Sequence, residues 1–176
     1  MNFSRTILGG ALAAALLASG ATVAWAKSLN VVASFTVLAD VVQQVGGDHV
    51  KVKSLVGPNG DPHEFEPSPD DAKNLKAADV VFVSGEGLEG WMDRLITASG
   101  YNGTPVVASE GVPTRKMEED GKSITDPHVW NSPKNVEIWI GNVEKALAAA
   151  DPDDAKDFKA NAATYLKVIQ DLDAYA

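Results

Sequence analysis

The chain has 176 residues, of which 45% are hydrophobic, with 24 acidic side chains, 15 basic side chains and no cysteine. This composition is typical of a folded domain and excludes a disordered or fibrous protein. The net charge of −9 argues against nucleic acid as a partner, because phosphate binding needs a basic surface. The lack of cysteine excludes a disulfide framework and thiolate metal ligands.

The first 26 residues have the pattern of a secretion signal. Arg5 is the only charged residue before an apolar, alanine-rich stretch from Ile7 to Ser19, and Ala24-Trp25-Ala26 has the small-x-small form that signal peptidase recognises. The apolar stretch is shorter than the roughly 20 residues of a membrane-spanning helix, so a stable membrane anchor is the weaker interpretation. We therefore expect export to the periplasm, with cleavage after Ala26.

Strands and helices are expected to alternate along the rest of the chain. Apolar runs and alternating patterns predict strands at residues 29–33, 50–56, 79–84 and 105–109. Helical spacing of apolar residues and helix-start signals predict helices at residues 37–45, 69–76, 88–96 and 133–147. The expected N-caps are Ser34, Ser68 and Ser132. This alternation predicts an α/β fold with a mostly parallel sheet flanked by helices.

Two segments are expected to be long loops. Residues 57–67 are rich in proline and glycine, and residues 110–126 are polar and show no periodicity.

A final helix is expected to begin after Asp151-Pro152. Its apolar residues keep a helical spacing up to the last positions, at Phe158, Ala162, Tyr165, Ile169 and Leu172. No glycine, basic turn or proline follows to end this helix. We therefore expect a helix that continues in a longer protein; the alternative is a C-terminal helix that frays.

Two of the three histidines lie in an identical tripeptide, Asp61-Pro62-His63 and Asp126-Pro127-His128. Proline stiffens both backbones, and both loops are predicted to follow strands, where ligands of parallel sheets bind. The two imidazoles could therefore meet and bind zinc, with the aspartates orienting the rings. The alternative is that each histidine is merely solvated. His49 has no such partner, and we expect it to be incidental.

A glycine-rich segment offers a different chemistry. Residues 85–90 match the G-x-G-x-x-G pattern of dinucleotide-binding loops, and Glu110 lies about where a ribose-binding acid is expected. However, Glu86 and Glu89 would place two negative charges beside a pyrophosphate. We therefore interpret the segment as a turn whose acids favour the start of a helix.

Two acids beside the first histidine suggest an alternative function. Glu64 and Glu66 flank Phe65 and lie near His63, so either could act as the general base, or as a ligand, in a secreted zinc hydrolase. An enzyme would keep one zinc position open for water, whereas a carrier would close it with protein.

At this point the chain resembles the periplasmic solute-binding components of zinc or manganese ABC transporters, the metal-binding group that includes streptococcal surface adhesins. The resemblance covers essentially the whole segment after the signal. The matching blocks are residues 34–40, 61–70, 85–92 and 126–130, and Asp151-Pro152 with Asn161-Ala162 and Tyr165-Leu166.

The resemblance implies a two-lobed protein in which one long rigid helix joins the lobes and four ligands hold a metal between them. Residues 27–150 would form the N-terminal α/β metal-binding lobe, and residues 151–176 would start the interlobe helix, with the second lobe missing from this chain. His63 and His128 would be two metal ligands, and Asp61, Asp126 and Glu66 would support them. The remaining ligands would belong to the missing lobe.

The implied function is extracytoplasmic capture of a divalent transition metal and its delivery to an ABC transporter membrane permease, without catalysis. Zn²⁺ is favoured because two imidazoles suit it, and Mn²⁺ is the alternative. Many zinc-specific members carry a histidine-rich acidic loop, whereas residues 110–126 hold acids but no histidine. An adhesin of the same fold is a further alternative.

Overall fold

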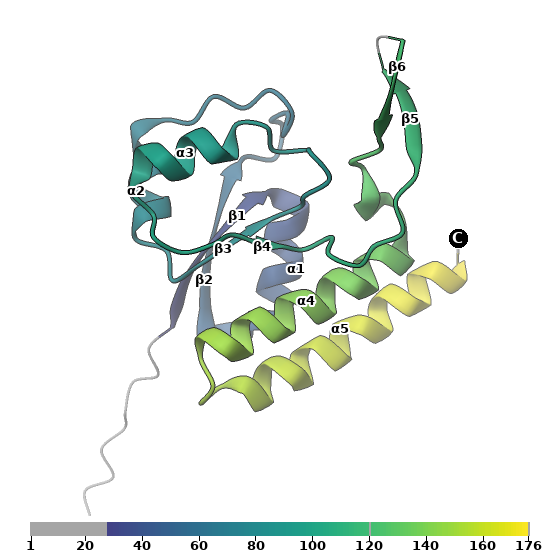
Figure 1. Cartoon of the computed structure of the whole chain (residues 1–176). Helices are drawn as coiled ribbons and strands as arrows, with labels where there is room; N and C mark the ends of the chain where they lie inside the picture. Colours follow the sequence, from purple (N-terminus) through teal and green to yellow (C-terminus); the bar gives the residue numbers. More distant parts are fainter. Residues whose placement is uncertain (1–27, 120, 176) are drawn as a thin grey trace, which may run out of the picture.

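A computed structural model of the chain describes residues 28–119 and 121–175 (Figure 1). The predicted secretion signal, residues 1–26, lies outside the described residues. The strands are β1 (Leu29–Phe35), β2 (Val50–Val56), β3 (Val80–Val83), β4 (Val106–Val107), β5 (Lys116–Glu119) and β6 (Lys122–Thr125). The helices are α1 (Thr36–Gly46), η1 (Gly47–His49), α2 (Pro69–Lys76), α3 (Met92–Ser99), η2 (Val129–Asn131), α4 (Pro133–Ala150) and α5 (Ala155–Tyr175).

The main sheet is parallel throughout and has the strand order β2-β1-β3-β4. After β1 the chain adds β2 on one side of β1, and it then crosses to the other side to add β3 and β4. Right-handed connections therefore place α1 on one face of the sheet and α2 and α3 on the opposite face. Nearly every residue of β1 and all of β3 are buried, as expected for strands covered on both faces. The predicted α/β fold with a mostly parallel sheet is confirmed.

Helices α4 and α5 form an antiparallel pair that packs on α1 (Figure 1). The buried positions of α5 are Phe158, Ala162 and Ile169, as the apolar spacing predicts. Leu172, which belongs to the same spacing, is 52% exposed. Among the described helices, none is long and apolar enough to cross a membrane.

Residues 110–126 are not a structureless loop as predicted. Strands β5 and β6 pair antiparallel and form a hairpin that projects from the sheet domain (Figure 1). Its strands are short and mostly exposed, so they lack the apolar alternation that normally identifies a strand. The Asp120-Gly121 pair was the available signal, because this dipeptide is typical of hairpin turns.

Two helix-start predictions are also wrong. Ser34 does not cap α1, which begins at Thr36 after Phe35. The Ser34 hydroxyl instead donates to Glu89 Oε1 at 2.6 Å, a partner far away in sequence. The predicted helix at residues 88–96 begins only at Met92, because residues 88–91 form turns. By contrast, α2 has the predicted bounds, and its Ser68 hydroxyl accepts from Asp71 N in a capping box.

Candidate metal centre

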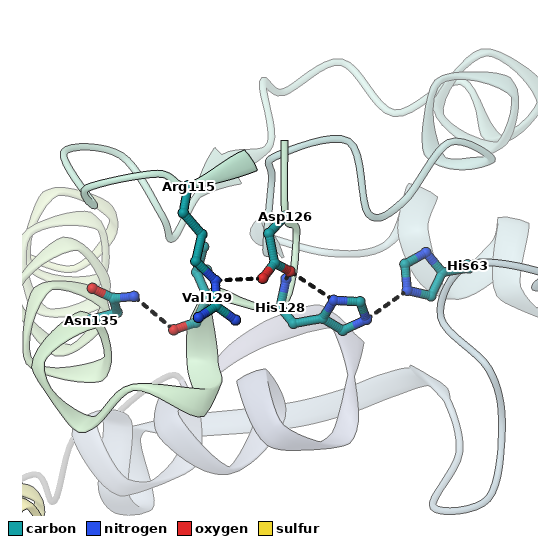
Figure 2. A network of polar contacts seen from close by, with 6 residues as sticks. All are labelled: His63, Arg115, Asp126, His128, Val129 and Asn135. Carbon is teal, nitrogen blue, oxygen red and sulfur yellow. Dashed lines mark hydrogen bonds and ion pairs between the residues drawn. The ribbon is translucent and has the colours of Figure 1, made fainter. Parts of the chain in front are cut away.

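The two Asp-Pro-His tripeptides meet in space. His63 lies in the loop after β2, and His128 lies between β6 and η2. Their Nε2 atoms are 3.2 Å apart, although the residues are 65 positions apart in sequence (Figure 2). The expected juxtaposition of the two imidazoles is therefore present, while metal binding by them stays a prediction.

A buried tryptophan fixes the loop that carries His63. Trp91, just before α3, donates from Nε1 to the Pro62 carbonyl at 2.8 Å, and its ring lies 4.9 Å from that of Phe65. Asp61 Oδ1 accepts from the His63 backbone N–H at 2.8 Å, which closes a tight turn. The hydrogen bond of Asp61 is therefore to the His63 backbone. Asp61 was expected to orient the His63 ring, but the described residues show no hydrogen bond between the two.

Asp126 holds the ring of His128. Its Oδ1 accepts from the His128 backbone N–H at 3.0 Å and lies 2.8 Å from Nδ1 of the same residue. Arg115 donates from Nε to the other carboxylate oxygen at 2.7 Å (Figure 2). A proton on Nδ1 leaves Nε2 with its lone pair directed at His63, which is the tautomer that a metal ligand needs.

The same contacts keep Asp126 ionised. Hydrogen bonds from the His128 backbone, the His128 ring and Arg115 lower the pKa of Asp126 from 3.8 to about 2. The carboxylate is buried, so its two oxygens depend on these donors for solvation. The expected orienting role of Asp126 is consistent with this geometry.

The spacing of the imidazoles suits a shared ion. Two nitrogen ligands at typical zinc distances and a tetrahedral angle lie about 3.3 Å apart. The Nε2 atoms of His63 and His128 are 3.2 Å apart, and both rings line a hollow of about 440 Å³. This separation is compatible with a shared zinc ion, as it is with a hydrogen bond between the two imidazoles.

The other acids proposed for this site lie elsewhere. Glu66 lines a separate hollow with Phe65 and Trp91. Within the described part of the chain, no hydrogen bond or ion pair connects Glu64 or Glu66 to either histidine. A supporting role of Glu66 stays a prediction. Two acids that line the hollow of the histidines were not among the predicted site residues: Glu119, on the hairpin, and Glu86, which was interpreted as part of a turn.

Glu89 occupies two backbone donors at the start of the glycine-rich segment. The carboxylate of Glu89 accepts from Ser84 N at 2.6 Å and from Gly85 N at 3.1 Å. It also accepts from Ser34 Oγ. The backbone donors after β3, which a phosphate would require, are thus already used by the chain itself. The contacts agree with the interpretation of this segment as a turn.

His49 is not incidental. Its Nδ1 lies 2.8 Å from Asp154 Oδ2, and its Nε2 lies 3.2 Å from Asp157 Oδ2. Its ring also meets the edge of Phe158 at 5.7 Å. These contacts tie η1 to the start of α5. No local pattern around His49 signals them, because Asp154 lies just before α5 and Asp157 in its first turn, more than one hundred positions later.

Comparison with known proteins identifies relatives across the described region. A family model described as zinc-uptake complex component A, periplasmic (ZnuA), matches residues 31–176. The iron-binding protein YfeA of Yersinia pestis is 34% identical over 149 residues, which are 85% of this chain and 48% of YfeA. The manganese-binding lipoprotein MntA of Bacillus subtilis is 37% identical over 154 residues, 85% of this chain and 49% of MntA. The chain thus spans about half the length of the curated relatives it matches.

Solved structures agree in fold. The Mn-bound periplasmic metal-binding protein from Candidatus Liberibacter asiaticus superposes with a TM-score of 0.74 at 30% identity, covering 80% of this chain and 53% of that protein. Zn(II)-bound AdcA from Streptococcus pneumoniae gives a TM-score of 0.72 at 30% identity, covering 84% of this chain and 32% of AdcA. The names of these relatives state metal binding, and the manganese ABC transporter substrate-binding lipoprotein of Streptococcus gordonii, 32% identical over 172 residues, is also named for transport.

Proposed function

Because the chain belongs to the family of the periplasmic zinc-uptake component ZnuA, we propose that it captures a divalent transition metal outside the cytoplasm for delivery to an ABC transporter permease. The observation that carries this proposal is the pair of imidazoles, with Nε2 atoms 3.2 Å apart at the wall of an open hollow. The relatives are substrate-binding proteins and not enzymes, so the alternative of a zinc hydrolase with Glu64 or Glu66 as base is not retained.

The proposed metal is zinc. Two neutral imidazole nitrogens match its ligand preference, and their separation fits a tetrahedral ion. Manganese is the second candidate, because two relatives are named for manganese, the MntA lipoprotein of Bacillus subtilis and the Mn-bound periplasmic protein. Either ion would take one nitrogen ligand from His63 and one from His128, so the choice between zinc and manganese depends on the other groups around the site.

We infer that residues 27–150 form a metal-binding lobe and that residues 151–176 begin the helix that links it to a second lobe in the family. The packing of α5 along α4 and α1 is compatible with a rigid element of this kind. Since the chain corresponds to about half of its relatives, His63 and His128 would be two members of a larger ligand set.

The proposed location is the periplasm. Its support is the signal pattern of residues 1–26 and the names of the relatives, which describe periplasmic proteins or lipoproteins. We expect N-terminal sequencing of the exported protein to begin at Lys27. Recovery of a chain that still begins with Met1 would contradict this part of the proposal.

Competition with a chromophoric chelator tests the metal site. We expect the chain to bind one Zn²⁺ in this assay, and the double variant His63→Ala/His128→Ala to lose this binding. Circular dichroism of the double variant checks that the fold is kept. Equal Zn²⁺ binding by a folded double variant would refute the assignment of the two histidines.

A further inference from the structure

The two histidines of the candidate metal centre are held in different ways. Asp126 lies 2.8 Å from Nδ1 of His128, so a side chain of the same tripeptide orients that ring. Asp61, the equivalent residue, accepts from the His63 backbone N–H instead. Among the described residues, the hydrogen-bonding partner of the His63 ring is the His128 ring itself. The position of the His63 imidazole therefore depends on how its loop is held.

The loop that carries His63, residues 57–67, has few polar contacts with the rest of the lobe. Within the described part of the chain, two hydrogen bonds join this loop to other elements. One is the contact between the two imidazoles at 3.2 Å. The other is donated by Trp91, from Nε1 to the carbonyl of Pro62 at 2.8 Å. In the absence of metal, Trp91 is thus the residue that relates this loop to the sheet domain.

The Trp91 hydrogen bond acts on the peptide unit from which His63 extends. The carbonyl of this unit belongs to Pro62 and accepts from Trp91, and its N–H belongs to His63 and donates to Asp61 Oδ1 at 2.8 Å. A peptide unit is planar, so bonds at both of its polar groups fix its orientation. The Asp61 bond is local to the loop, whereas the Trp91 bond comes from another element.

Trp91 is itself firmly placed. It is 2% exposed and directly precedes α3. Two positions earlier, the Glu89 carboxylate accepts from Ser84 N and from the Ser34 hydroxyl, both at 2.6 Å. Ser34 lies in β1, and Ser84 directly follows β3. The glycine-rich turn of residues 85–90 therefore joins Trp91 to the two central strands of the main sheet.

We propose that Trp91 is a positioning residue of the metal centre, and that its hydrogen bond to Pro62 holds His63 at the distance from His128 that a shared cation requires. The inference rests on the proposed function of the two histidines. Trp91 acts through the loop and does not bind the metal. Its contribution is to affinity, because a loop that is already held loses less conformational freedom when the metal binds.

Two substitutions remove the donor. Trp91→Phe keeps an aromatic ring against Phe65, and Trp91→Met fills the same space with a flexible apolar side chain. Trp139→Phe is the matched control. Trp139 is 0% exposed, and its Nε1 is a buried atom without a hydrogen-bond partner among the described residues. The control thus makes the same change of side chain in the core and breaks no hydrogen bond.

Affinity and stability should respond differently to these variants. We expect Trp91→Phe and Trp91→Met to weaken Zn²⁺ binding by about 3–10-fold, which corresponds to the loss of one hydrogen bond. Trp139→Phe should destabilise the chain, because it also empties part of the core, and should leave Zn²⁺ affinity within about twofold. Chelator competition measures the affinities, and urea unfolding of the metal-free chains measures their stability.

Amide hydrogen exchange separates positioning from a general structural role. The backbone N–H groups of His63 and His128 are bonded alike, each to the aspartate two positions earlier, at 2.8 Å and 3.0 Å. In metal-free Trp91→Phe we expect faster exchange at His63 and unchanged exchange at His128. A tryptophan that only stabilised the fold would affect both amides alike.

The inference is overturned if both Trp91 variants bind Zn²⁺ within twofold of the unmodified chain. It is also overturned if the amides of His63 and His128 are accelerated to the same extent in Trp91→Phe. Failure of the proposed function has a different signature, because the His63→Ala/His128→Ala variant would then keep its metal. The exchange measurement uses metal-free protein, so it tests the hold of Trp91 on the loop independently of that result.

Discussion

His128 and His49 have the same kind of partner at Nδ1 but different partners at Nε2. In both residues an aspartate oxygen lies 2.8 Å from Nδ1, Asp126 in the first and Asp154 in the second. The opposite nitrogen differs. Nε2 of His128 faces the imidazole of His63 at 3.2 Å, whereas Nε2 of His49 faces the carboxylate of Asp157 at the same distance.

The second partner decides the role of each histidine. A cation can bind between two neutral imidazole nitrogens, because each offers a lone pair and neither carries a charge that needs a partner. The His49 ring lies between two carboxylates, and these contacts tie η1 to the start of α5. An aspartate beside a histidine is therefore insufficient to identify a metal ligand.

The largest expected effect is on metal affinity. If His128 is a ligand as proposed, His128→Ala should weaken Zn²⁺ binding by at least about 100-fold, more than the loss of a supporting group costs. His49→Ala should leave Zn²⁺ binding within about twofold, because its ring belongs to an ion-paired contact outside the hollow. Isothermal titration of both variants checks this. Similar losses in both would remove the distinction drawn between the two histidines.

The next effect concerns the aspartates that hold the rings. Asp126→Asn weakens the contact to Nδ1 and breaks the pair with Arg115, so Zn²⁺ affinity should fall by about 10–100-fold. Asp154→Asn makes the equivalent change at His49 and should leave Zn²⁺ affinity unchanged. Chelator competition measures both. If Asp126→Asn bound Zn²⁺ normally, the orientation of His128 by Asp126 would not matter for the site.

Stability should show the reverse order. His49→Ala removes contacts to Asp154 and Asp157 and the edge contact to Phe158, so the free energy of unfolding should fall by about 1 kcal/mol. His63→Ala, at an exposed loop position, should change it by less than about 0.5 kcal/mol without metal. Urea unfolding of the metal-free variants measures the difference, and a larger loss in His63→Ala would reverse the assignment.

The smallest effect is a pH dependence. The pKa of Asp126 is lowered from 3.8 to about 2 in the folded chain, so its ionised form stabilises the fold above about pH 4. This stabilisation is lost as the pH falls from about 4 through about 2. The urea midpoints of the chain and of Asp126→Asn should therefore differ more at pH 5 than at pH 2.5. A constant difference would indicate that the contacts of Asp126 do not favour its charge.

Local patterns were sufficient for much of the fold. Helix α2 has the predicted bounds because its start signals, Ser68, Pro69 and Asp71, are all within one turn. Strands β1 and β3 were recognisable because burial on both faces demands apolar runs, and β2 because exposed lysines alternate with its apolar residues. The local pattern was misleading where a residue depends on a distant partner. Ser34 has the pattern of an N-cap, but its hydroxyl donates a hydrogen bond to Glu89.

The sequence by itself determined the α/β fold and the two stiffened Asp-Pro-His loops, because these depend on periodicity and on the restricted backbone of proline. The repeated tripeptide also predicted that the two imidazoles could meet, whereas only the tertiary structure decided that two carboxylates face His49. The partners of His128 and His49 lie 65 and more than one hundred positions away, and no local preference encodes such distances. The packing of helices and loops against the sheet sets these contacts: an imidazole pair at His63 and His128, and a link between η1 and the start of α5 at His49.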